Sequence, residues 1–333
     1  MAHGFDNSEQ QESIRDLPWS KRAVVPALVT LIGLAIVATG FGGEYQRFVG
    51  IQILVSALLA VSFRGLFRIG VFSLAGPGFM GLGAYSYALL QLDMRLPALM
   101  ACFVALLLCL ACACLTGPMA WRVTRIYLAL LTLSLVVVLT MIYGELRITG
   151  AHGGRSGIEP FTSGGVEGWR WFLTCVIASS LLLISLAVLE QTRLGRAWRA
   201  IGVNEAFAES VGVRTTAHSY WAFVLYSTVA AFAGVILAAN NGYIYPSAFG
   251  FERVVFMLLC VFVGGVSTFI GPLVGSFFVG WLQEFLSAYQ QYTMLILGST
   301  LVLVILILPD GIVRLPAALM KLRLGARPGA PLN

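Results

Sequence analysis

Residues 96–117 read LPALMACFVALLLCLACACLTG, a run of chain without one charged side chain. A helix that crosses the hydrocarbon core of a bilayer needs about 20 predominantly apolar residues, so this segment alone predicts a membrane span. The composition extends that prediction to the whole chain, because 59% of its 333 residues are hydrophobic and only 11% are charged. Soluble domains carry about 25% charged residues. We therefore expect an all-α integral membrane protein.

Further apolar runs of similar length lie on both sides of this segment, and short polar connections separate them. The ten candidate spans are 23–41, 47–63, 70–91, 96–117, 125–145, 169–190, 217–240, 252–268, 271–288 and 292–308. They predict a single bundle of about ten transmembrane helices within a domain at 23–312, between polar tails at 1–22 and 313–333. One Gly-Pro interruption in each half would suit a five-plus-five inverted repeat, although the halves share no clear sequence similarity.

The distribution of basic residues gives the expected orientation. With the N-terminus inside and ten alternating spans, 15 of the 21 Lys and Arg residues fall on the inner side and 6 on the outer side. Basic residues concentrate on the cytoplasmic side of membrane proteins, so both tails are expected to be cytoplasmic. The start of the chain shows no cleavable signal sequence. The net charge of +6 then reflects contact with membrane lipid, and nucleic acid is not an expected partner.

Acidic residues and motifs exclude several classes of function. The carboxylates nearest to the spans, Glu145, Glu190, Glu252 and Glu284, are expected at helix ends where water reaches them. A proton-coupled carrier would need charged groups inside its spans. The sequence also lacks the G-x-x-x-x-G-K-[ST] loop of ATPases and clustered residues typical of an enzyme or metal site. The C-x-x-C of Cys109 and Cys112 lies mid-span without further ligands, which favours helix packing.

The loop at about 191–216 contains two short amphipathic segments. The first helix is expected at about Arg196–Ile201, and the second is capped by Asn204, begins at Glu205 and stops at Gly212. Helices of about two turns are not stable alone in water, so this pair needs something to pack against. Two interpretations stay open from the residues alone: a docking site for a cytoplasmic protein, or a surface helix whose arginines bind anionic headgroups.

The segment SLAGPGFMGLGAY at residues 73–85 places a proline and several glycines inside an apolar run. Such a break is tolerated at membrane depth only where protein or a water-filled cavity covers the freed backbone groups. It indicates either a substrate route or close helix packing, and the two are compatible. The residues expected to line a route are Ser73, Gly76, Pro77, Gly78, Phe79, Tyr85, Thr132, Ser134 and Asn240.

Two other glycine-rich segments carry weaker signals. GGVSTFIGPLVG at residues 264–275 is expected to form a tight turn between two spans. In the outer loop at 149–158, His152 and Arg155 could meet an anionic group, but a solvated connection is the favoured interpretation.

Several blocks of the sequence resemble the LivM-type permeases, the transmembrane subunits of branched-chain amino acid ABC importers. The resemblance covers about residues 50–315 and is carried in chain order by five short blocks. These are SLAGPGFMGLGAY at 73–85, RIYLALLT at 125–132, GGRSGI at 153–158, GRAWRAIGVNE at 195–205 continuing to Gly212, and LPDG at 308–311.

The resemblance implies a division of labour among several proteins. Such a permease pairs with a second, LivH-like permease in the bacterial inner membrane, two ATPase subunits bind ATP and Mg below it, and a periplasmic binding protein delivers solute. This chain would then need no cofactor of its own and would work by alternating access. The loop becomes the coupling region, which favours the docking interpretation, through the residues Arg196, Arg199, Asn204, Glu205, Phe207, Ala208, Glu209 and Gly212.

Two departures from the family pattern concern the solute. Ala75-Gly-Pro-Gly78 replaces the polar run usual before the phenylalanine, and Asp310 replaces a basic residue. The expected function is import of branched-chain or related small amino acids. The alternatives are a permease of the same family for urea, short amides or aromatic acids, and, as a more distant alternative, a secondary transporter or channel.

Overall fold

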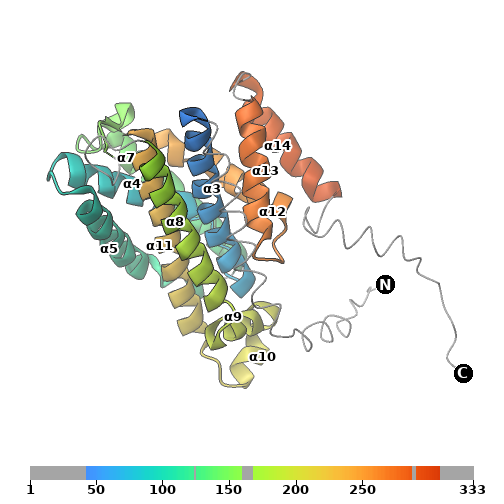
Figure 1. Cartoon of the computed structure of the whole chain (residues 1–333). Coiled ribbons are helices and arrows are strands. Elements are labelled where there is room, and N and C mark those ends of the chain that lie inside the picture. Colours follow the sequence, from blue (N-terminus) through green and yellow to red (C-terminus); the bar gives the residue numbers. More distant parts are fainter. Residues whose placement is uncertain (1–42, 124, 160–167, 287–289, 308–333) are drawn as a thin grey trace, which may run out of the picture.

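The computed structural model describes residues 43–123, 125–159, 168–286 and 290–307. Nearly all of this part is helical, and six of its helices are long and apolar enough to cross a membrane. The long helices are α3 (Glu44–Ile69), α4 (Gly76–Leu92), α5 (Ala98–Thr116), α7 (Arg125–Glu145), α8 (Gly168–Leu189), α11 (Thr215–Asn241), α12 (Phe251–Gly264), α13 (Gly271–Leu286) and α14 (Gln290–Ile307). They form one bundle (Figure 1).

The prediction of an all-α membrane protein is confirmed, and each predicted span from 47–63 onward has its own helix. The first predicted span at 23–41, both tails and Asp310 lie outside the described residues, so the total of ten spans stays a prediction. The inverted repeat also stays a prediction. Short elements complete the chain: α6 (Met119–Arg122), η2 (Ala151–Gly153), β1 (Arg155–Ser156), α9 (Arg193–Val203), α10 (Glu205–Ser210), β2 (Tyr243–Ile244) and η3 (Pro246–Phe249).

Helices α3 and α11 form the centre of the bundle. In α3, 94% of the most apolar stretch is buried inside the protein, and in α11 the share is 83%, whereas in α5 and α7 it is only 28%. The outer helices therefore present most of their apolar side chains to lipid or to another protein, and the packing that positions the rest of the fold is around α3 and α11.

Two glycines allow α4 and α11 to touch backbone to backbone. A Cβ atom on Gly83 would overlap the carbonyl of Ala231, and one on Gly234 would overlap the carbonyl of Met80. Helices in membranes associate through such small residues because lipid gives apolar side chains little reason to prefer protein. The glycines of the segment at 73–85 thus serve close packing, which was one of its two predicted roles.

The start of α4 differs from the expected interruption of a helix. The helix begins at Gly76 with Pro77 in its first turn, a position where the missing N–H of proline costs nothing. The chain before it is irregular and mostly buried, and two of its amides find side-chain acceptors: Leu74 N donates to Thr132 Oγ1 at 2.9 Å, and Ala75 N donates to Ser73 Oγ at 3.3 Å. The proline therefore starts a helix here and does not kink one.

The outer loop is tied down on the bundle. Strands β1 and β2 pair antiparallel, with Arg155 opposite Ile244. The Arg155 guanidinium also binds Asp93 through Nη2 at 2.6 Å and donates from Nε to the carbonyl of Ile148 at 2.9 Å. This loop was expected to be a solvated connection, but in the structure its arginine already holds a carboxylate of its own chain.

The contact between α4 and α11 predicts the outcome of a single methyl addition. Gly83→Ala should lower the stability of the protein by about 1–3 kcal/mol, because overpacking forces the helices apart. Gly298→Ala in α14 is the matched control, since open space surrounds that glycine. The measurement is thermal unfolding in detergent micelles, and equal melting temperatures for the two variants would contradict the described contact.

Candidate functional site

Helices α9 and α10 project from one end of the bundle, where α3 and α8 end and α11 begins (Figure 1). We call this pair the foot. Both helices were expected from the sequence, and α9 is a few residues longer than predicted. The predicted cap is confirmed: Asn204 Oδ1 accepts a hydrogen bond from Phe207 N at 3.0 Å. Gly212 follows α10 with a positive φ of 85°, which glycine adopts without strain.

One face of α9 packs closely against the bundle. Trp198 and Ile201 are buried, and the Trp198 ring lies 6.0 Å from that of Tyr226 on α11. A Cβ atom on Gly195 would overlap the carbonyl of Glu190, and one on Gly202 would overlap the carbonyl of Arg68. A displacement of α9 toward the bundle must therefore displace the ends of α3 and α8.

The opposite face of the foot is open and partly apolar. Val203 is 88% exposed and Phe207 is 63% exposed, and Arg196, Arg199 and Glu205 are exposed beside them. Not every residue expected to contact a partner faces outward. Ala208 is fully buried, and Glu209 accepts a hydrogen bond from Thr215 Oγ1 at 2.6 Å, which holds the foot to the start of α11.

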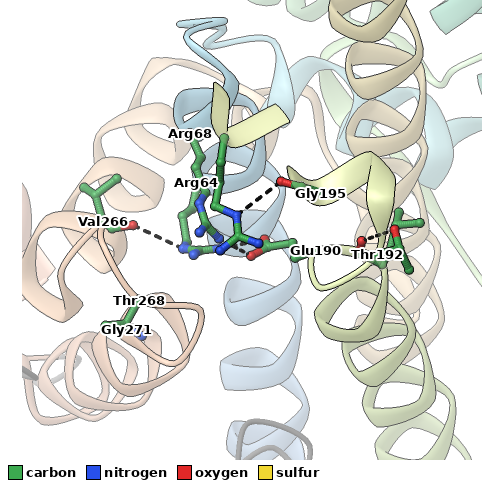
Figure 2. A network of polar contacts seen from close by, with 10 residues as sticks. Arg64, Arg68, Glu190, Thr192, Gly195, Val266, Thr268 and Gly271 are labelled. Carbon is green, nitrogen blue, oxygen red and sulfur yellow. Dashed lines mark hydrogen bonds and ion pairs between the residues drawn. The ribbon is translucent and has the colours of Figure 1, made fainter. Parts of the chain in front are cut away.

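A buried cluster of charges lies where the foot meets the bundle (Figure 2). Glu190, at the end of α8, receives Arg64 Nη1 at 2.6 Å on one carboxylate oxygen and Arg68 Nη1 on the other. Arg64 also donates from Nε to the carbonyl of Val266 at 3.2 Å, in the turn between α12 and α13. The Arg64 side chain is fully buried. We call these three side chains the ion cluster.

The ion cluster corrects one expectation from the sequence. Glu190 was expected to be reached by water, but only 8% of the residue is exposed. The reason is the length of α3, which continues to Ile69 and ends at Gly70, six residues beyond the predicted span. The extra turns carry Arg64 and Arg68 from the expected loop into the protein interior, where they cover the carboxylate.

Several of the predicted route residues lie together at the start of α4. Ser73 and Thr132 are buried and accept hydrogen bonds from the irregular backbone there. Gly78 packs against α7, and its carbonyl accepts a hydrogen bond from Tyr143 Oη at 3.1 Å. The Phe79 ring meets Phe223 of α11 edge to face, with ring centres 5.9 Å apart.

The remaining route residues are spread along the bundle. The Tyr85 ring stacks on Tyr143 at 4.7 Å, yet its hydroxyl is buried without a hydrogen-bond partner among the described residues, as is Asn240 Nδ2. Ser134 is exposed and bonds to the carbonyl of Leu130 on its own helix, so it does not lie with Thr132. A cavity of about 120 Å³ opens between α3 and α13, and its lining includes none of the predicted route residues.

Comparison with known proteins gives this arrangement a family. Residues 46–307 match the model of the family described as branched-chain amino acid transport system / permease component. The chain belongs to this family. The match spans both the foot and the ion cluster, and it confirms the resemblance seen in the sequence.

Curated relatives of this permease include proteins named LivM and LivH. It is 28% identical over 287 residues to the high-affinity branched-chain amino acid transport system permease protein LivM of Escherichia coli K12, which covers 78% of this chain and 68% of the relative. LivM of Salmonella typhimurium is equally similar. It is also 29% identical over 143 residues to LivH of E. coli K12, covering 42% and 46% of the two chains. No solved structure matches the permease significantly.

The ion cluster is the part of the permease that sequence reasoning missed. One signal was present, because Arg64 and Arg68 are four residues apart and so lie on one face of a helix. Treating them as loop residues hid that spacing. The partner carboxylate lies more than a hundred residues away in the sequence, at a separation of 126 from Arg64, and no local pattern connects the two.

The burial of the ion cluster predicts its contribution to stability. Glu190→Ala should destabilise the permease by about 3–5 kcal/mol, because it leaves the fully buried guanidinium of Arg64 without its carboxylate. Asp93→Asn removes the carboxylate of the exposed ion pair with Arg155 and should cost about 0–1 kcal/mol. Thermal unfolding in one detergent compares the two, and equal losses would mean that Glu190 is solvated.

Proposed function

We propose that this permease is one of two membrane subunits of an ABC importer in the bacterial inner membrane. Its solute is then a branched-chain or related small amino acid. The support is its similarity to permeases named LivM over most of its length and to LivH over a shorter stretch. By analogy with those names, a LivH-like chain is the expected second permease, and a periplasmic binding protein delivers the solute.

The observation that carries the coupling assignment is the two-sided construction of the foot. Its base is fixed to the bundle through buried groups, while its tip exposes Val203 and Phe207. Apolar side chains gathered on a surface mark sites of contact with another protein or a membrane. The six-residue α10 is held by its own chain, through the buried Ala208 and the hydrogen bond from Thr215 to Glu209, so it presents its exposed side chains in a fixed position. A groove on a cytoplasmic ATPase would receive them.

The energy for transport then comes from separate ATPase subunits, which bind ATP and Mg themselves. Closure of the two ATPases would push and pull the foot, and the bundle would open alternately to the two sides of the membrane. The excess of basic residues on the predicted inner side agrees with this placement. Arg196 and Arg199 add positive charge that can meet acidic groups on the ATPase.

The solute route is proposed along α4. Buried donors without a partner are uncommon, because leaving a polar group unpaired away from water costs about 1–3 kcal/mol. The Tyr85 hydroxyl and the Asn240 amide are two such groups. A passing amino acid carries a carboxylate, which could accept a hydrogen bond from both groups.

Changing the tip of the foot should separate docking from folding. Phe207→Asp places a charge on the exposed apolar surface and should abolish copurification of the ATPase and uptake of leucine, while the permease melts as the wild type does. Met94→Asp is the matched control, because Met94 lies just after α4, away from the foot, and is 68% exposed. Normal ATPase binding by Phe207→Asp would show that the foot docks elsewhere.

Removal of the unpaired hydroxyl tests the proposed route. Tyr85→Phe should leave stability unchanged or slightly raised, because the lost hydroxyl has no bond to lose, yet it should alter the KM for leucine uptake in proteoliposomes. Tyr143→Phe is the comparison, since that hydroxyl binds the carbonyl of Gly78. It should lower the melting temperature. Unaltered uptake kinetics in Tyr85→Phe would remove Tyr85 from the route.

A further inference from the structure

The ion cluster joins three parts of the bundle: the end of α3, the end of α8 and the turn between α12 and α13. We infer that Arg64, Arg68 and Glu190 form the link that carries movement of the foot into α12 and α13. This inference rests on the proposed function, because it needs a foot that an ATPase moves. The three side chains act as positioning residues and touch neither solute nor ATP.

The input side of the link is the contact between α9 and the cluster. Glycines at 195 and 202 let the backbone of α9 lie directly on the backbone of Glu190 and Arg68. Tyr226 completes the seat, because its ring packs against Gly65 of α3 on one side and Trp198 of α9 on the other. A shift of α9 therefore displaces the backbones of Glu190 and Arg68 directly, because α9 contacts them through backbone and not through flexible side chains.

The output side is the turn that follows α12. Arg64 holds the carbonyl of Val266, and its guanidinium carbon lies 5.4 Å from the centre of the Phe269 ring in the same turn. Around this turn the backbones of α12 and α13 touch, since a Cβ atom on Gly264 would overlap the carbonyl of Gly271 and one on Gly275 that of Cys260. Two helices in such contact move as one body, and Arg64 is bound to it.

The same body reaches the proposed solute route. A Cβ atom built on Gly76, the first residue of α4, would lie 3.1 Å from the sulfur of Met257 in α12. Gly76 follows the irregular segment whose amides bond to Thr132 and Ser73. Movement received at Val266 can thus arrive at the start of α4 by direct packing, without crossing lipid.

Two features distinguish the ion cluster from a purely structural contact. The cluster contains two guanidinium groups and one carboxylate, so its charge is not balanced, and Arg64 Nη2 is buried without a hydrogen-bond partner among the described residues. A static polar core is expected to have every donor satisfied. A spare donor instead leaves Arg64 able to form a different set of bonds after a small shift, as a two-state element requires.

The test uses the complete importer, with both permeases, both ATPases and the binding protein reconstituted in liposomes. Two variants break the link: Glu190→Gln, and the double variant Arg64→Met with Glu190→Leu. The double variant is included because apolar replacement of a whole buried ion pair often preserves or raises stability. Both should copurify with the ATPases and hydrolyse ATP, while leucine uptake per ATP falls about 2- to 30-fold.

The controls make each outcome decisive. Asp93→Asn removes a carboxylate from the ion pair at the other end of the bundle and should keep the uptake per ATP of the wild type. Uptake per ATP equal to wild type in the folded double variant would overturn the inference. So would loss of ATPase binding, which would place the cluster in docking, or failure of both variants to fold, which would make it purely structural. A wild-type chain that recruits no ATPase would instead refute the proposed function.

Discussion

The need to hydrogen-bond every buried backbone group governs this structure, because lipid offers neither donors nor acceptors. It explains why nearly all of the described chain is helical. It also explains why the irregular stretch before α4 lies inside the bundle, where hydroxyls of Thr132 and Ser73 replace the missing helical partners. Irregular backbone is possible there only because α7 lies beside it.

The same constraint leaves little energy to hold the helices together, since apolar side chains are equally at home in lipid and in protein. Close backbone contact at glycines therefore supplies much of the specificity, between α4 and α11 and between α12 and α13. The ion cluster adds a directional contact at the end of the bundle that bears the foot. Small residues set the distances between helices there, and charges set which helix ends stay together.

The sequence was sufficient where the signal was local. The helix at 125–145 has the predicted ends, because Arg125 and Glu145 flank an uncharged run, and Asn204 caps α10 as its residue type suggested. The sequence did not predict the structure where the place of a residue depends on a partner far away in the chain. From the sequence Arg64 was expected in a loop, but in the structure it lies in α3 and pairs with Glu190. Pro77 was expected to interrupt a helix, but the hydrogen bonds of Ser73 and Thr132 show that a helix begins there. Long-range pairings of this kind leave no periodic pattern.

Asn204 closes α9 and opens α10 at the same time, so a single residue forms the whole corner of the foot. Such a corner fixes the direction of α10 relative to α9 as well as the lengths of the two helices. Each residue added to or removed from a helix turns whatever follows it by about 100°. The corner should therefore accept changes of side chain much more readily than changes of length, because an altered residue count would turn the phenyl ring of Phe207 away from the exposed face that it now occupies.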